Sequence, residues 1–377
     1  MLATIKVFNK LHSPISVAGF VFPPGQEVEI KIEETSMDFR TLRGQKGLKV
    51  AKTISDEWKR KHSPDSRYGF NMVYDIPSGK LKDMSPYTHV VEALSEPIIP
   101  YLPEGQVGFT EKPGIGLNLR FFSARRIIET GKSPISPNDV FTSHGIGDKN
   151  YWIAPRIAPF RHALVPGPTW RDRIKRGGYP GHVWVVGYTK LDPIFNGEYL
   201  RQEREKPYVV WAPTHAYRYR HRGRSSYPWC MDLIREIPDC YDKHMALHPS
   251  ARLSLHRRQD VTLQELLDAD VVIADAGSTL YEAWALGKPV IFPDWLCKDD
   301  VLAHFKDDPE NLEYRIYNEG IGYHAESMIH LISLIEVALR DGMKQQEIDF
   351  MEGVFPSRLR GNAGKMSARA LMEIKEG

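Results

Sequence analysis

The stretch VVIADAGSTLYEAWAL, residues 271–286, contains residue types that can bind a phosphate group at the start of a helix. Gly277 lets backbone amides approach a ligand closely, because it has no side chain. Ser278 and Thr279 begin a predicted helix whose free N–H groups and dipole attract an anion. Glu282, one turn after Ser278, is placed to accept hydrogen bonds from ribose hydroxyls. The alternative is an ordinary helix cap by Ser278 or Thr279, and the stretch alone does not decide between the two.

Two further loops follow predicted strands in the same half of the chain. KHMALHPSAR ends a strand at His248, and the proline after it restricts the turn. VVWAPTHAYRYRHRGR ends another strand at Thr214 and continues into arginines that alternate with aromatic residues. These arginines are Arg218, Arg220, Arg222 and Arg224. Their guanidinium groups can bind phosphates bidentately, and the alternatives are a nucleic-acid surface, a membrane surface or a solvated loop.

A histidine lies between a predicted strand and a pair of glycines in DVFTSHGIGDKNYW. Gly145 and Gly147 expose the ring of His144 and permit close backbone approach, and Lys149 follows. An imidazole across from an anion site suits a general base that removes the proton of an acceptor hydroxyl. Further on, HVWVVGYTKLDPI ends a strand shortly before Lys190.

Alternating strands and helices must position these loops. From residue 68 onward, apolar strand candidates alternate with helices, which is typical of right-handed βαβ units with parallel sheets. In such sheets ligands bind outside the carboxyl ends of the strands, where all of these loops lie. We therefore expect an α/β protein with two Rossmann-like domains facing a cleft. The acceptor domain is expected at residues 68–195 and the nucleotide-donor domain at 206–350.

The two ends of the chain have different patterns. Short alternating runs separated by Pro and Gly predict a small antiparallel β appendage over residues 1–52, followed by a charged linker. Residues 351–377 are predicted to form a C-terminal helical segment. Within the first block, LRFFSARRIIETG (119–131) is predicted as a helix, and in the second the pair Asp299-Asp300 is assigned to a loop.

The composition is that of a soluble globular protein, with 42% hydrophobic and 26% charged residues. No apolar run approaches the ~18 residues that span a bilayer, and the N-terminus lacks the apolar core of a secretory signal, so we expect a cytoplasmic protein. The three cysteines form neither a disulfide framework nor a CxxC zinc motif. A net charge of +2 is too small to argue for a nucleic-acid partner.

The order of these motifs resembles that of one family. His-Gly after a strand, Gly-Tyr-Thr-Lys-Leu-Asp, Ala-Pro-Thr, His-Pro and Asp-Ala-Gly-Ser are similar to the motifs of the CDP-glycerol glycerophosphotransferases, the teichoic-acid polymerases and primases. The similarity covers roughly residues 140–295 and is absent from the first 50. It implies the two-domain GT-B fold and a donor activated by a nucleotide.

The resemblance also implies roles for five residues. His144 matches the catalytic base of the family, and His248 matches the histidine that contacts the donor diphosphate. Ser278 matches a serine that binds phosphate. Glu282 matches an Asp near the donor ribose, and Thr214 matches the Thr of the Ala-Pro-Thr motif.

This sequence departs from the family's pattern at several positions. Lys190 and Thr189 replace the Arg and Pro of the motif Gly-Tyr-Pro-Arg-x-Asp, and Gly277 replaces the first serine of a Ser-Ser pair. The Arg that usually follows Ala-Pro-Thr is displaced to Arg218 or beyond. The loop at Gly277 also resembles the donor loops of UDP-sugar transferases and UDP-sugar 2-epimerases, so the donor need not be CDP-glycerol.

We expect a GT-B-type transferase that moves a glycosyl or glycerophosphate group from a CDP- or UDP-activated donor to an acceptor hydroxyl. His144 is expected to remove the acceptor proton, and His248 to act at the leaving phosphate. Donor contacts are expected from Thr214, Arg218, His248, Gly277, Ser278, Thr279 and Glu282. Contacts with acceptor or phosphate are expected from Lys149, Lys190, Arg220 and Arg222. The donor is a substrate, and neither a metal ion nor a cofactor is expected, because GT-B enzymes typically act without bound metal and no Asp-x-Asp motif follows a strand.

Two other functions stay open. A phage-type DNA glycosyltransferase acting on hydroxymethylated bases would account for the basic runs RYRHRGR (218–224) and RDRIKRGG (171–178). A non-catalytic nucleotide-binding or virion-associated module would account for the β appendage. A UDP-sugar 2-epimerase is less favoured, because the acid/base carboxylates that it requires are not apparent in the sequence. The acceptor is expected on a polymer, either glycan or nucleic acid, and the sequence does not define the oligomeric state.

Overall fold

The computed structural model describes most of the chain after residue 68 and part of the N-terminal region. The described residues are 2–9, 15–17, 20–24, 26–33, 48–52, 69–75, 86–110, 112–122, 134–148, 154–214, 224–247 and 259–377. The chain divides into two compact units, Met1–Pro64 and Asp65–Gly377. The predicted charged linker lies outside the described residues.

The N-terminal unit is built from antiparallel strands, as its alternating pattern predicts. A three-stranded sheet has the order β4-β1-β5, with β1 at Leu2–Asn9, β4 at Glu27–Glu33 and β5 at Leu48–Lys52. A separate hairpin pairs β2 (Ile15–Val17) with β3 (Phe20–Phe22).

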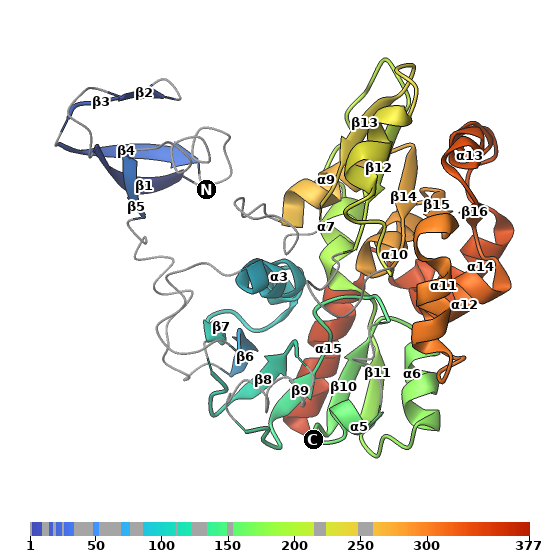
Figure 1. Ribbon diagram of the computed structural model, residues 1–377. Helices are drawn as coiled ribbons and strands as arrows, with labels where there is room; N and C mark the ends of the chain where they lie inside the picture. The colour runs from blue at the N-terminus through green and yellow to red at the C-terminus, as the bar shows by residue number, and fades with distance from the viewer. Residues whose placement is uncertain are drawn as a thin grey trace. The chain divides into compact units, whose positions relative to one another are not determined.

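The first sheet of the larger unit is parallel throughout, with the strand order β11-β10-β9-β8-β6-β7 (Figure 1). Its strands are β6 (Phe70–Val73), β7 (Val107–Thr110), β8 (Leu117–Arg120), β9 (Asp139–Phe141), β10 (His162–Val165) and β11 (His182–Val185). The connecting helices include α3 (Pro86–Ser95), α5 (Ala154–Ile157), α6 (Pro168–Arg176), η2 (Ile99–Tyr101), η3 (Thr189–Leu191) and α7 (Asp192–Phe195).

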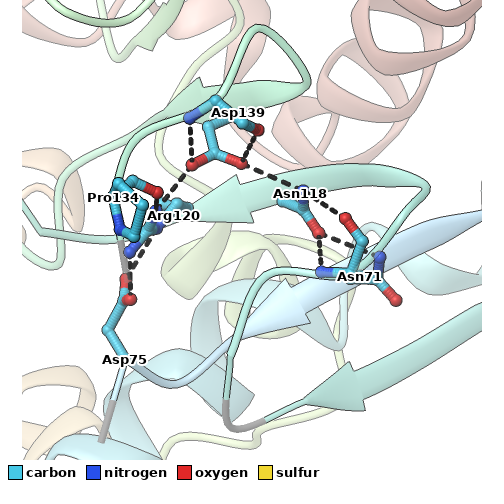
Figure 2. Close-up of polar contacts among 8 residues, drawn as sticks. Asn71, Asp75, Asn118, Arg120, Pro134 and Asp139 are labelled. Carbon is cyan, nitrogen blue, oxygen red and sulfur yellow. Dashed lines mark hydrogen bonds and ion pairs between the residues drawn. The ribbon is translucent and has the colours of Figure 1, made fainter. Parts of the chain in front are cut away.

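A buried polar cluster joins three strands of this sheet (Figure 2). The Arg120 guanidinium is fully buried, and it pairs with Asp75 after β6 and with Asp139 on β9, the latter at 2.6 Å. Asn118 on β8 donates to Asp139 and accepts from Asn71 on β6, both at 2.9 Å. Burial alone would lower the pKa of Arg120, but the carboxylates of Asp75 and Asp139 raise it above its ordinary value.

The sequence-based prediction of a helix over 119–131 was wrong at its start. Leu119 and Arg120 belong to strand β8, and residues 123–133 lie outside the described residues. A strand that buries Asn118 and Arg120 lacks the apolar pattern by which a central strand is recognised. These polar side chains are tolerated because their partners lie on neighbouring strands.

The second sheet is also parallel, with the order β13-β12-β14-β15-β16. Its strands are β12 (Tyr208–Ala212), β13 (Asp242–Met245), β14 (Val271–Ala274), β15 (Val290–Pro293) and β16 (Tyr323–Ala325). Its helices are α8 (Cys230–Leu233), η4 (Ile234–Glu236), α9 (Gln259–Asp268), α10 (Ser278–Ala285), α11 (Asp294–Phe305), α12 (Leu312–Glu319) and α13 (Met328–Asp341). Asp299 and Asp300, assigned to a loop from the sequence, lie inside α11.

The C-terminal segment is helical, as predicted, and consists of α14 (Gln345–Val354), η6 (Ser357–Leu359) and α15 (Ala363–Glu376). The last helix, red in Figure 1, packs against the first sheet although it is last in the sequence. Near its end, Lys375 Nζ lies 4.4 Å from the centroid of the Phe70 ring on β6. Near its start, the N–H of Gly364 donates to Asp192 Oδ2 at 2.6 Å. The helix therefore fastens the chain terminus to the first half of the molecule.

Candidate functional site

Parallel strands of both sheets lead into the loops that were singled out from the sequence. His144 follows β9, Lys190 follows β11, Thr214 follows β12 and Gly277 follows β14. Each therefore lies at the carboxyl end of its strand, which is where parallel α/β sheets bind their ligands.

The start of α10 does not use a hydroxyl cap. Gly277 is the N-cap residue, and no described side chain caps the helix there. Its φ of 86° lies in a region that favours glycine, and its N–H donates to Glu313 Oε1 at 3.0 Å. Ser278 and Thr279 are the first helical residues. The alternative in which Ser278 or Thr279 caps the helix is therefore wrong, and the Gly277 amide already has a protein partner.

The loop after β9 contacts the start of α10 directly. The N–H of Gly147 donates to Ser278 Oγ at 3.2 Å. A Cβ on Gly145 would lie 2.5 Å from Ser278 Oγ, and a Cβ on Gly147 would lie 2.8 Å from the backbone carbon of Gly277. At position 147 only glycine permits this approach, because a Cβ there would meet backbone atoms. The contact brings together two motifs separated by 131 residues.

The His144 ring lies on this same loop, three residues before Gly147. It is half-buried and packs at a tilt against Phe122, with 5.3 Å between ring centroids. The loop that carries an imidazole and the helix start that carries the predicted phosphate site are thus in contact. This arrangement suits proton transfer beside a bound anion.

Glu282, on α10, is buried against Tyr188 and Lys190, which follow β11 in the first half of the chain. Its Oε1 accepts from Lys190 Nζ at 2.7 Å and from the Tyr188 hydroxyl at 3.0 Å. Burial raises the pKa of Tyr188 well above its ordinary value, and the adjacent Glu282 carboxylate raises it further, so the hydroxyl stays protonated and donates. Lys190 and Glu282 thus contact each other, and their predicted roles at the acceptor and the ribose stay predictions.

Asp275 binds described residues on either side of the arginine run. Its carboxylate is fully buried and accepts from the backbone N–H of Thr214 at 2.7 Å, of Ser226 at 2.6 Å and of Ala276 at 2.7 Å. Burial raises the pKa of Asp275, and these hydrogen bonds oppose the increase. Because Thr214 and Ser226 flank the arginine run, Asp275 holds both ends of that loop beside the start of α10.

Five predicted site residues lie outside the described residues: His248, Lys149, Arg218, Arg220 and Arg222. Arg224, the last arginine of the run, is described, and its guanidinium carbon lies 5.8 Å from the centroid of the Phe305 ring. Burial lowers the pKa of Arg224, while the carboxylates of Glu313 and Asp300 raise it. The end of the run therefore lies near α11 and the start of α12.

The sequence analysis gave no role to two buried carboxylates beside α10, Asp275 of the Asp-Ala-Gly-Ser motif and Glu313. Asp275 directly follows β14, a position that is a usable signal in a parallel sheet. Glu313 lies 36 residues beyond Gly277, in the first turn of α12, and no local pattern marks it. Across the described ranges, no three His, Cys, Asp or Glu side chains are grouped to hold a metal ion, and a metal-independent reaction stays a prediction.

Comparison with known proteins finds similarity in structure alone. No protein-family model matches the chain, and no curated protein sequence matches it. Among solved structures, the wall teichoic acid polymerase TagF superimposes with a TM-score of 0.50 and 15% identity, covering 83% of this chain and 90% of that chain. A TagF variant soaked with CDPG gives a TM-score of 0.51 and 14% identity, with 86% and 91% covered. The chain has the GT-B fold.

The GT-B fold confirms the expected architecture of two Rossmann-like halves with parallel sheets. At 14–15% identity the similarity to TagF establishes the fold and not the reaction. In this GT-B chain, every helix in the described ranges is too short or too polar to cross a lipid bilayer.

Proposed function

We propose that this chain is a transferase that moves a glycosyl or glycerophosphate group from a CDP- or UDP-activated donor to an acceptor hydroxyl. The proposal rests mainly on the contact between the His144 loop and the start of α10, made by the hydrogen bond from the Gly147 N–H to Ser278 Oγ. TagF, which shares the fold, is a wall teichoic acid polymerase, and a variant of it was soaked with CDPG. The motif order of this sequence supports the same class of donor.

In the proposed reaction, the acceptor oxygen forms a bond to the transferred group while its proton passes to the His144 imidazole. The bond between that group and the donor phosphate breaks, and the electron pair stays on the phosphate oxygen of the departing nucleotide. Ser278 Oγ accepts from Gly147, which leaves its own proton to donate to this oxygen. The free N–H groups of the first turn of α10 add further stabilisation.

Replacement of His144 tests this assignment. We expect His144→Ala to lower turnover by about 10²- to 10⁴-fold, the usual contribution of a general base, with little change in the donor dissociation constant. Turnover is measured with CDP- and UDP-linked donors, and donor binding by calorimetry. The matched control is His182→Ala, because His182 is exposed at the first residue of β11, the end of the strand opposite the site. Unchanged turnover in His144→Ala would remove the base assignment, and lost donor binding would move His144 to the donor site.

The donor class is identified by nucleotide-dependent stabilisation. A ligand present at 100 times its dissociation constant stabilises the fold by about 2.7 kcal/mol, so CDP, UDP, GDP and ADP derivatives can be ranked by thermal shift. Binding without turnover on any acceptor would instead support a non-catalytic nucleotide-binding or virion-associated module. Product analysis of UDP-sugars separates transfer from 2-epimerisation.

The structure weakens one of the two reasons for a nucleic-acid acceptor. The basic run on α6 is largely paired within the protein: Arg171 with Asp172, Arg173 with Asp148 and Asp308, and Arg176 with Glu310. Arg173 is buried in its pairs, whereas the exposed pairs of Arg171 and Arg176 are weak. A gel-shift titration separates the acceptors, since duplex binding that weakens steeply with salt would favour a phage-type DNA glycosyltransferase acting on hydroxymethylated bases.

A further inference from the structure

Asp148 lies on the loop that carries His144, four residues after it, and is completely buried. Its Oδ2 accepts from the backbone N–H of Leu312, the first residue of α12, at 3.0 Å. The same carboxylate pairs with the guanidinium of Arg173 on α6. Its carbonyl oxygen accepts from Asn311 Nδ2 at 3.1 Å. Asp148 therefore binds the start of α12 through both its side chain and its backbone.

The start of α12 is in turn bonded to the start of α10. Asn311 caps α12, since its Oδ1 accepts from the N–H groups of Glu313 at 3.0 Å and Tyr314 at 3.1 Å. The side chain of Glu313 accepts from the N–H of Gly277 at 3.0 Å. A displacement of α12 would therefore be transmitted to the residue that precedes Ser278.

These contacts form a closed circuit. From Asp148 it passes to Leu312, from Glu313 to Gly277, and from Ser278 back to Gly147, the residue before Asp148. Two of its hydrogen bonds have a carboxylate acceptor, and such charge-assisted bonds are roughly twice as strong as neutral ones. Because Asp148 and Glu313 are both buried, water competes little for these bonds.

We propose that Asp148 is a positioning residue that fixes the loop carrying His144 relative to the Ser278 helix start. The inference rests on the proposed function, in which the proton acceptor and the phosphate site must act on one donor–acceptor pair. Asp148 has no direct role in the chemistry. It sets the separation of the two groups, and a misplacement of about 1 Å between reacting groups can cost on the order of 100-fold in rate.

The test is Asp148→Asn, with Asp308→Asn as its matched control. Both aspartates pair with Arg173, but the Asp308 side chain is 34% exposed, and its described ion pair is with Arg173 alone. We expect Asp148→Asn to lower kcat by roughly 10- to 100-fold with the donor dissociation constant little changed, and Asp308→Asn to keep the wild-type kcat. If both variants lowered kcat equally, the effect would come from the loss of a partner for Arg173, and the proposal would be overturned.

Amide hydrogen exchange provides a readout that does not depend on activity. We expect exchange at Gly147 and Gly277 to accelerate in Asp148→Asn and to stay at the wild-type rate in Asp308→Asn. Asn311→Ser serves if Asp148→Asn does not fold, because serine keeps a helix cap but is too short to reach the Asp148 carbonyl. Unchanged exchange in the folded variant overturns the proposal, as does accelerated exchange with unchanged kcat. A wild-type protein that turns over no donor would refute the proposed function, while the exchange experiment would still test the circuit.

Discussion

Lys190 and Glu282 form a buried ion pair. The two residues are 5% and 2% exposed, and Nζ and Oε1 are 2.7 Å apart. A buried charge is tolerated only when its partner is present, because desolvation costs several kcal/mol per ion. Tyr188 supplies a further hydrogen bond to the same carboxylate. The pair therefore links the loop after β11 to α10.

We predict that Lys190→Met lowers the free energy of unfolding by about 3 to 5 kcal/mol, because it leaves the Glu282 carboxylate buried without a counter-charge. Urea denaturation monitored by tryptophan fluorescence measures the change. The double variant Lys190→Met, Glu282→Leu should recover much of the loss, since it removes both charges.

The matched control for this pair is Arg315→Met. Arg315 and Glu319 form an exposed i,i+4 pair, with side chains 37% and 41% exposed. Removal of such a pair should cost under about 1 kcal/mol. If Lys190→Met lowers the free energy of unfolding no more than Arg315→Met does, the buried pair stabilises the protein no more than an exposed pair.

At the scale of elements, the site depends on the close approach of a loop and a helix start. Gly147 is in contact with Gly277 and Ser278, and a Cβ at position 147 would lie 2.8 Å from the backbone nitrogen of Ser278. Backbone atoms cannot rotate away as a flexible side chain can. The loop after β9 and the start of α10 would have to separate to admit even one methyl group.

We predict that Gly147→Ala costs about 1 to 3 kcal/mol of stability, as overpacking does, and lowers turnover by at least about 10-fold by separating His144 from Ser278. The free energy of unfolding and kcat are measured side by side. Gly69→Ala is the control, because its Cβ would meet the mobile ends of Lys375 and Gln106, which can move aside. Wild-type turnover in Gly147→Ala would contradict the close approach.

At the scale of the whole unit from Asp65 to Gly377, the last helix returns to the first sheet. Asp192, just after η3, accepts from the N–H of Gly364 in the first turn of α15 through Oδ2, while its Oδ1 has no hydrogen-bond partner among the described residues. Burial raises the pKa of Asp192 to about 6, although the backbone N–H groups of Gly364, Ala363 and Gly361 lower it. A single carboxylate therefore makes the attachment of α15 sensitive to pH.

The direction of this pH dependence follows from proton binding. Between about pH 4 and pH 6 the folded protein keeps a proton on Asp192 that the unfolded chain releases, so the contribution of Asp192 to stability falls as pH rises. We predict that Asp192→Asn, which stays neutral, gains up to about 3 kcal/mol relative to wild type between pH 4 and pH 7. Urea unfolding at four pH values measures the difference.

The control for the pH experiment is Asp341→Asn. Asp341 is exposed on α13, and its pKa is lowered by the Arg340 guanidinium, so loss of its charge should give no relative gain as pH rises. If the free energies of unfolding of Asp192→Asn and wild type differed by the same amount at every pH, Asp192 would have an ordinary pKa in the folded protein.

Local information in the sequence determined the architecture. The apolar runs of most strands, and the helices between them, predict parallel α/β units without knowledge of any contact. The order of motifs along the chain indicated the GT-B fold, which the comparison with TagF confirms. The exception is β8, where Asn118 and Arg120 are buried by partners up to 47 residues away, so local polarity was misleading.

Tertiary structure alone decided which of the candidate groups meet. From the sequence, Ser278 was equally a cap or a phosphate ligand, and the structure excludes the cap because Gly277 is the N-cap residue and no described side chain caps the helix. The contact between Lys190 and Glu282 spans 92 residues, and that between Asp148 and Leu312 spans 164. Periodicity and propensity act over a few residues, whereas these contacts arise from the packing of one sheet's loops against the other's helices. Which charges pair, and which stay available to a substrate, is decided there.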